Sequence, residues 1–239
     1  DGAMINTAWG WLLLEKYNNA EALKSFQAVI EADPEWAPAY AGIASVLEDE
    51  DPPKAIAAAA KALTIDPNLA EARLVIARLH LDDDRAAEAR AEIDKVLAFN
   101  PSNLDAHALL AAMAYVKDDK ATYEQEVAAA LAVNPNYGEI YRVAGQQAAS
   151  HYRFEEAAAL VEKGLTLDPS NGRAAADLGM HLLRTGDEAG ARRSLDRSFR
   201  TDPFDLVTYN LLKMLDSLEA FVTVRDGDVL LKMHRDEAP

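Results

Sequence analysis

The chain has 239 residues and a mass of 26.0 kDa, and half of its residues are hydrophobic, which is enough for the core of one or two domains. Its 24 basic and 40 acidic residues give a formal net charge of −16, which repels nucleic-acid phosphates and anionic membrane surfaces. The absence of cysteine excludes disulfides and thiolate sites, and no apolar run reaches the roughly 18 residues of a membrane span. We therefore expect a soluble protein, cytoplasmic or bacterial periplasmic, with no nucleic-acid partner and no membrane insertion.

Six prolines recur along the chain at a nearly constant interval, which is 33 residues once and 34 residues four times. They are Pro34, Pro67, Pro101, Pro135, Pro169 and Pro203. Each follows Asp or Asn, and because a proline disfavours the α conformation of the preceding residue, each pair predicts the end of a helix. A fixed period of this length indicates a repeat architecture.

Each repeat contains the pattern of two helices. In the second helix, the first position of the apolar stripe is held by Ala22, Ala55, Ala89, Tyr123, Ala157 and Ala191. In the first helix, one position is always Gly or Ala, namely Gly10, Ala44, Ala77, Ala111, Gly145 and Gly179. A small residue held there allows two helix backbones to approach closely, so we expect six closely packed helix pairs with one buried stripe.

These residues resemble the tetratricopeptide repeat (TPR), a 34-residue helix-turn-helix unit with a W-x2-L-G-x2-Y, A-x3-F and P pattern. Ala22, Phe26 and Pro34 fit the first copy, whereas Tyr123 departs from the pattern at an alanine position. The resemblance covers about residues 3–204. It implies an all-α solenoid, in which antiparallel helix pairs stack into a right-handed superhelix with a concave groove.

After Pro203 the repeat continues for one helix, from about Asp205 to Leu218. Lys213 then stands where six copies have Gly or Ala, which should prevent a seventh close helix pair. We therefore predict that this helix closes the solenoid, which forms a domain of residues 3–218.

Residues 219–239 have a different period and form a separate tail. Asp226-Gly227 between two β-branched or apolar runs predicts a β-hairpin. Because an isolated two-stranded hairpin is marginal in water, it either packs on the last helix or begins a truncated downstream domain. An unpaired strand edge also invites pairing with a second copy, which leaves homo-oligomerisation open.

The run from Phe221 to Pro239 is similar to the junction in large bacterial repeat proteins at which a zinc peptidase-like domain begins. The zinc signature H-E-x-x-H is absent from this chain, and none of its histidines is spaced as a metal pair. The resemblance implies that the chain is the non-catalytic arm of a longer protein. The opening Asp1-Gly2-Ala3-Met4 is likewise typical of an excised structural fragment.

No motif in the sequence predicts catalysis, a cofactor or a metal. The glycine-rich and nucleophile signatures of phosphate-binding and hydrolytic enzymes are missing. The acidic runs 48–51 and 82–84 lack the spacing of a calcium loop, so we expect solvated turns. His80, His107 and His181 fall within helices and are expected to pack or face solvent. The chain should not be an enzyme.

Function is expected in the concave groove lined by the first helix of each repeat. The predicted groove residues are Trp11, Leu74, Arg78, Ala108, Ala112, Tyr115, Arg142, Gln146 and Met180. Most of these side chains are small or apolar and would form the walls of the groove. Arg78 and Arg142 are isolated cations, each able to hold a carboxylate through two hydrogen bonds. In the alternative, the arginines pair with neighbours such as Glu71 or Glu139, and another domain of the same protein closes the groove.

The leading hypothesis is a non-catalytic protein-interaction scaffold that binds an extended or helical peptide in this groove. Arg78, Arg142 and Gln146 would fix the polar groups of the peptide. The alternative function is the recruiting or regulatory arm of a larger zinc peptidase-like protein whose catalytic domain lies outside this chain.

Overall fold

The computed structural model describes residues 2–16, 18–227 and 229–237, which form thirteen α-helices followed by a two-stranded sheet and a short 3₁₀ helix. The helices are α1 (Gly2–Glu15), α2 (Asn19–Ala32), α3 (Ala37–Leu47), α4 (Pro52–Ile65), α5 (Ala70–Asp82), α6 (Ala86–Phe99), α7 (Leu104–Val116), α8 (Lys120–Val133), α9 (Glu139–Ser150), α10 (Phe154–Leu167), α11 (Gly172–Thr185), α12 (Glu188–Thr201) and α13 (Leu206–Leu218). The strands are β1 (Phe221–Asp226) and β2 (Val229–His234), followed by η1 (Arg235–Glu237).

The periodic Asp-Pro and Asn-Pro pairs end the second helix of every repeat. At these positions the residue before proline leaves the helical conformation, as at Asp33 (φ −141°) and Asp168 (φ −123°). Several second helices begin at an aspartate whose carboxylate accepts a hydrogen bond from a backbone N–H of the first turn, as Asp51, Asp119 and Asp187 do. Both ends of these helices are therefore specified by local sequence.

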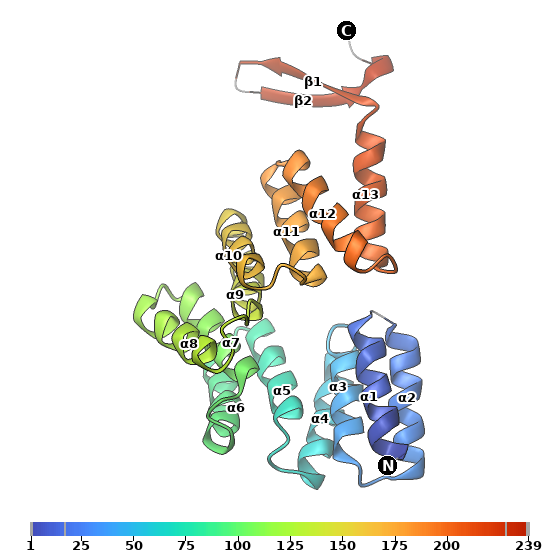
Figure 1. Ribbon diagram of the computed structural model, residues 1–239, viewed down its shortest axis with the longest axis vertical. Coiled ribbons are helices and arrows are strands. Elements are labelled where there is room, and N and C mark those ends of the chain that lie inside the picture. The colour runs from blue at the N-terminus through green and yellow to red at the C-terminus, as the bar shows by residue number, and fades with distance from the viewer. Residues whose placement is uncertain (1, 17, 228, 238–239) are drawn as a thin grey trace.

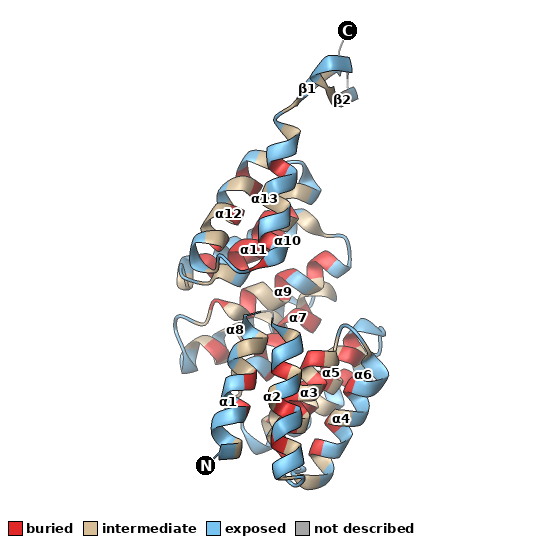
Figure 2. Ribbon diagram, turned by 90° about the vertical axis from the view of Figure 1, so that its right-hand side faces the viewer, coloured by how far each residue is buried: buried red, intermediate tan, exposed pale blue. Residues whose placement is uncertain are grey.

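The helix pairs stack into a right-handed solenoid that curls back on itself (Figure 1). The path runs from α1 to α6, turns at α7 and α8, and continues through α9 to α13, with the hairpin at the far end (Figure 1). Buried residues line the faces between neighbouring helices, and exposed residues cover the outer surface (Figure 2). The stacking is uneven, because α7 packs closely against both α8 and α9.

Phe26 is the anchor of the first helix pairs. Its ring is fully buried and packs edge-on against Trp11, with ring centroids 5.5 Å apart. A Cβ atom built on Gly10 would lie 2.6 Å from the ring, and one built on Gly42 would lie 2.3 Å from it. A side chain at either position would therefore displace the Phe26 ring, because α1 and α3 approach it closely. The periodic pattern predicted Gly10 but not Gly42.

Tyr123 occupies the position that alanine holds in the other second helices, and it makes α8 different from them. Its ring packs edge-on against Tyr115 of α7, with centroids 5.3 Å apart. Its hydroxyl oxygen is buried without a hydrogen-bond partner among the residues that the structure describes. This departure from the repeat pattern is therefore accommodated by aromatic packing between α7 and α8.

Gly179→Leu is expected to lower the free energy of unfolding by about 1–3 kcal/mol, because it overpacks the crossing of α11 and α12. A Cβ atom on Gly179 would lie 2.6 Å from Cγ of Leu195 and 3.3 Å from the backbone oxygen of Ala191. Urea unfolding measures the loss. Gly2→Leu is the matched control, because nothing lies within 4 Å of a Cβ atom there. Equal midpoints for the two variants would contradict the close crossing.

The predicted β-hairpin is confirmed, with β1 antiparallel to β2 and Phe221 opposite His234. Gly227 has a φ of +55°, as expected of a glycine in a tight turn, and residue 228 lies outside the described residues. The hairpin projects beyond α13 (Figure 1). Lys232 pairs with Glu188 of α12, and the backbone N–H of Arg235 donates to the oxygen of Ala220 at 2.9 Å.

Among the helices of the described ranges, none combines the length and the apolar character that crossing a membrane requires.

Candidate functional site

Arg78 is not an isolated cation, which corrects the expectation from sequence. Its Nε and Nη2 atoms donate to the two carboxylate oxygens of Glu48 at 2.6 and 2.7 Å. Burial opposes the charge of the guanidinium, but the contact with Glu48 raises the pKa of Arg78 above its ordinary value. The partner is Glu48 of the first acidic run rather than Glu71. This run is therefore more than a solvated turn, since Glu48 joins α3 to α5.

Arg142 is held by two carboxylates, one of which is the predicted neighbour Glu139. Its Nε atom donates to Glu139 at 2.8 Å and its Nη1 atom donates to Asp177 of α11 at 2.8 Å. Burial works to raise the pKa of Glu139, but hydrogen bonds from Arg142 and Asn171 lower it overall. Gln146 donates to Asp177 at 3.3 Å. These side chains therefore tie α9 to α11.

Three of the predicted apolar groove residues are buried in the core, so they are not accessible to a partner. Leu74 packs in one buried cluster between α5, α6 and α7. Ala108 and Ala112 pack in another between α7, α8, α9 and α10. The physical reason is that neighbouring helices of the stack cover these side chains: α6 and α7 cover Leu74, and α8, α9 and α10 cover the two alanines. Met180 is half-buried, and Trp11 packs on the ring of Phe26 as described above.

Tyr115 belongs to a polar cluster at the turns between paired helices. Its hydroxyl donates to Glu156 at 2.8 Å, and Arg153 donates to the same carboxylate at 2.7 Å. The hydrogen bonds from Arg153 and Tyr115 lower the pKa of Glu156 to about 2. Burial and the bond to Glu156 raise the pKa of Tyr115 to about 12. At neutral pH the cluster therefore joins a neutral phenol to a charged pair, and it connects two neighbouring repeats.

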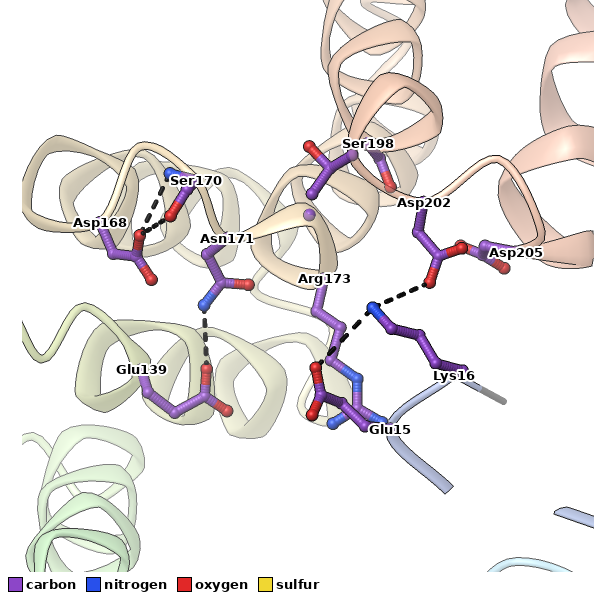
Figure 3. A pocket seen from close by; sticks show the side chains of 12 residues that line it. Glu15, Lys16, Glu139, Asp168, Ser170, Asn171, Arg173, Ser198, Asp202 and Asp205 are labelled. Carbon is purple, nitrogen blue, oxygen red and sulfur yellow. Dashed lines mark hydrogen bonds and ion pairs between the residues drawn. The ribbon is translucent and has the colours of Figure 1, made fainter. Parts of the chain in front are cut away.

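The structure places a polar cleft where the first repeat meets the last ones (Figure 3). The cleft has a volume of about 380 Å³ and lies between the end of α1, the start of α9, the α10–α11 turn with the start of α11, and the C-terminal end of α12. It is lined by Glu15, Lys16, Glu139, Asp168, Ser170, Asn171, Gly172, Arg173, Ser198, Thr201, Asp202 and Asp205. Five of these carry carboxylates and two carry cations. Its walls are therefore polar and acidic, unlike the apolar groove expected from the sequence.

Lys16, the residue that follows α1, reaches across the cleft. Nζ of Lys16 lies 3.5 Å from the carboxylate of Asp202 and 3.8 Å from that of Glu15 (Figure 3). On the other wall, Asn171 donates to Glu139 at 3.3 Å. Asp168 and Asp202 precede Pro169 and Pro203 in two of the periodic Asp-Pro pairs, for which the sequence predicts only the local role of ending a helix. Their common location depends on the curl of the solenoid.

A sequence profile of the tetratricopeptide repeat matches residues 46–113 and 148–214, which together make up more than half of the chain. A second profile of the same repeat matches residues 7–70. The chain belongs to the tetratricopeptide repeat family. No curated protein sequence matches it significantly.

Solved structures share the TPR fold with this chain. A tetratricopeptide repeat protein from Parabacteroides merdae is 18% identical, with a TM-score of 0.61 over 90% of this chain and 84% of that one. The Cut9-Hcn1 hetero-tetramer of the APC/C is 20% identical, with a TM-score of 0.55 over 89% of this chain and 42% of that one. A human IFIT1 dimer with m7Gppp-AAAA is 18% identical, with a TM-score of 0.60 over 83% of this chain and 50% of that one. This TPR chain thus spans half or less of the latter two proteins.

Two histidines of the TPR array are buried, and their surroundings differ. Nδ1 of His107 lies 2.6 Å from the carboxylate of Glu126, and its Nε2 lies 2.9 Å from the backbone oxygen of Pro101. In His181, by contrast, both ring nitrogens are buried without a hydrogen-bond partner among the described residues. Over the part of the chain that the structure describes, no three His, Asp or Glu side chains are grouped to hold a metal ion.

His181→Leu is expected to reduce the amount by which the free energy of unfolding falls between neutral and acid pH. Burial lowers the pKa of His181 below its ordinary value of 6.5, with Asp177 opposing and Arg184 assisting the shift. Below pH 6.5 the unfolded chain binds a proton that the folded chain does not, so stability falls as the pH falls from 6.5 towards the lowered pKa. Urea unfolding at pH 7.5 and 5.5 should show a smaller decrease for the variant than for the wild type. The exposed His151→Gln is the control, and parallel decreases for all three proteins would exclude His181 as the cause.

Proposed function

We propose that this TPR chain is a non-catalytic scaffold that binds a basic segment of a protein or peptide in its acidic cleft. The observation that carries the proposal is the Lys16 side chain, which already places an ammonium group beside Asp202 in that cleft. A lysine or arginine of a partner would take the same position.

The charge of the cleft supports a basic partner. Arg142 neutralises Glu139, but the other four carboxylates of the cleft still outnumber Lys16 and Arg173, and the whole chain has a net charge of −16. This field accelerates the approach of a cationic segment and slows that of an anionic one. The human IFIT1 dimer is bound to m7Gppp-AAAA, but phosphate groups would be repelled by the carboxylates of this cleft, so we expect no RNA partner.

The Lys16 contact is weak enough to be exchanged. The Lys16 side chain is about half exposed, and exposed ion pairs contribute only about 0–1 kcal/mol. A partner arginine could offer two parallel hydrogen bonds to Asp202, a stronger contact than a single ammonium makes. We therefore infer that a basic partner displaces Lys16. The Cut9-Hcn1 hetero-tetramer, an assembly of protein chains on the same fold, is consistent with a scaffold role.

Peptides of twelve residues that differ only in Lys and Arg content test this function, with binding followed by fluorescence anisotropy. Basic peptides should bind, and Asp168→Asn with Asp202→Asn should weaken the binding about tenfold, which corresponds to roughly 1.4 kcal/mol. Asparagine retains the acceptor oxygen that each aspartate uses in its turn. Lys16→Gln should strengthen the binding.

The matched control for this experiment carries Glu31→Gln and Glu162→Gln, two exposed carboxylates that do not line the cleft. It removes the same charge and should bind as the wild type does. Equal affinity for basic, neutral and acidic peptides would overturn the proposal, as would equal weakening in the control.

We also propose that residues 219–239 form a unit separate from the solenoid of residues 3–218. The support among the described residues is the exposed ion pair of Lys232 with Glu188, which joins the hairpin to α12, together with the exposed Val229 and Leu231 on the hairpin. Deletion of residues 221–239 should leave the helical circular-dichroism signal and the cooperative unfolding nearly unchanged. Loss of cooperative unfolding would instead identify the hairpin as a cap of the solenoid.

The alternative function, a recruiting arm of a zinc peptidase-like protein, stays a prediction. The projecting hairpin favours it, because its strand edges offer the start of a larger sheet. A parent reading frame with H-E-x-x-H after residue 239 would support it. Pairing of two copies through the same strand edge is the competing use, and light scattering at increasing concentration distinguishes a monomer from an oligomer.

A further inference from the structure

A second depression lies outside the acidic cleft, between the α9–α10 turn and the end of α11. Its volume is about 520 Å³. It is lined by Ala149, Ser150, Tyr152, Phe154 and Arg184, and none of these residues lines the cleft. Its lining combines two aromatic rings and one cation, a chemistry opposite in charge to that of the cleft.

Tyr152 is presented to solvent in a conformation that tyrosine rarely adopts. Its φ is +62°, and the residue is 83% exposed. The same place in other repeats, two residues before the second helix, is held by Asp84, Asp118 and Gly186, also with positive φ. Aspartate and glycine tolerate this region of backbone space, whereas a bulky aromatic residue there is unfavourable. The turn itself therefore does not require a tyrosine, and the exposed ring calls for another explanation.

Arg184 is the cation of the depression, and it is held by an aromatic ring rather than by a carboxylate. Its guanidinium lies 4.9 Å from the centroid of Phe154, whose ring packs edge-on against Tyr152 at 6.0 Å. Among the described residues, no carboxylate forms an ion pair with Arg184, whereas Arg142 and Arg153 each pair with carboxylates. A guanidinium stacked on a ring keeps its N–H edge available for a carboxylate.

We propose that this depression binds a peptide segment in which an aromatic side chain neighbours a carboxylate. The carboxylate pairs with the free edge of Arg184, and the aromatic ring packs against Tyr152. This site goes beyond the proposed function, because its ligand carries the opposite charge to the basic segment expected in the cleft. The two sites would allow one scaffold to hold two different segments.

Short peptides test this site on the full chain, with binding followed by backbone amide shifts in NMR. The probe is acetyl-Gly-Phe-Asp-Gly-amide, and its controls replace Asp by Asn or Phe by Ala. A peptide that ends in a free Phe carboxylate tests whether the carboxylate can come from a chain end. Saturable shifts should map to the five lining residues, and each control peptide should bind about tenfold more weakly than the probe.

Four variants separate binding from folding. Arg184→Gln should abolish binding of the probe, whereas Arg200→Gln, an exposed arginine elsewhere, should leave it unchanged. Tyr152→Gly relieves the positive φ, so it should be at least as stable as the wild type and yet bind weakly. Asp168→Asn with Asp202→Asn should bind this probe normally, which distinguishes failure here from failure of the cleft. No saturable shift at the lining residues, or equal binding by Arg184→Gln, would overturn the proposal.

Discussion

Phe26→Ala is expected to lower the free energy of unfolding by about 3–5 kcal/mol, the largest effect of any single substitution considered. The ring is fully buried and lies against two glycines, Gly10 of α1 and Gly42 of α3. Because neither glycine has a side chain that could move into the space, truncation leaves a cavity that the surroundings cannot fill. Urea unfolding of the full chain measures the loss. Phe99→Ala, the same truncation of a ring that is 66% exposed, should cost less than about 1 kcal/mol.

A double-mutant cycle sharpens this prediction. A Cβ atom on Gly42 would lie 2.3 Å from the Phe26 ring, so Gly42→Ala alone should destabilise the protein. In the Phe26→Ala background the methyl group enters the cavity, and the same substitution should then be neutral or stabilising. The expected coupling energy is about 0.5–3 kcal/mol. Additive effects of the two substitutions would contradict the packing of Phe26 between α1 and α3.

Arg142→Met is expected to cost about 3 kcal/mol, because it leaves Glu139 and Asp177 without their shared cation. The Arg142 side chain is only 11% exposed, and both carboxylates are mostly buried. Arg90→Met removes one partner of an exposed ion pair with Asp94 and should cost less than about 1 kcal/mol. Urea unfolding at low and high salt should show that the Arg142 effect persists in salt. Equal costs for the two substitutions would show that the Arg142 pair is not structural.

The Arg142 result also decides between two roles. A purely structural arginine predicts that adding Glu139→Gln and Asp177→Asn to Arg142→Met recovers part of the lost stability, since no unpaired carboxylate then remains. An arginine that serves a ligand predicts instead that the ligand-free protein tolerates Arg142→Met. No recovery together with a small initial loss would favour the ligand-binding role expected from sequence.

The sequence by itself determined the architecture, because its signals act over one helix turn or one β-turn. The Asp-Pro and Asn-Pro pairs end helices through a local clash, and Gly227 permits the hairpin turn through its own backbone freedom. The small residue at Gly179 marks a helix crossing through its size alone. Repetition of these local rules at a constant interval then leaves the tetratricopeptide repeat as the fold.

Only the tertiary structure decided which side chains meet. Arg78 donates hydrogen bonds to Glu48 of the preceding repeat, and Leu74 is buried in the core. Both contacts depend on the angle by which one repeat is rotated relative to the next. Lys16 meets Asp202 only after these small rotations have accumulated over the whole solenoid. A local sequence pattern does not specify the total rotation between the first and the last repeat. The helices could therefore be predicted from the sequence, whereas the acidic cleft could not.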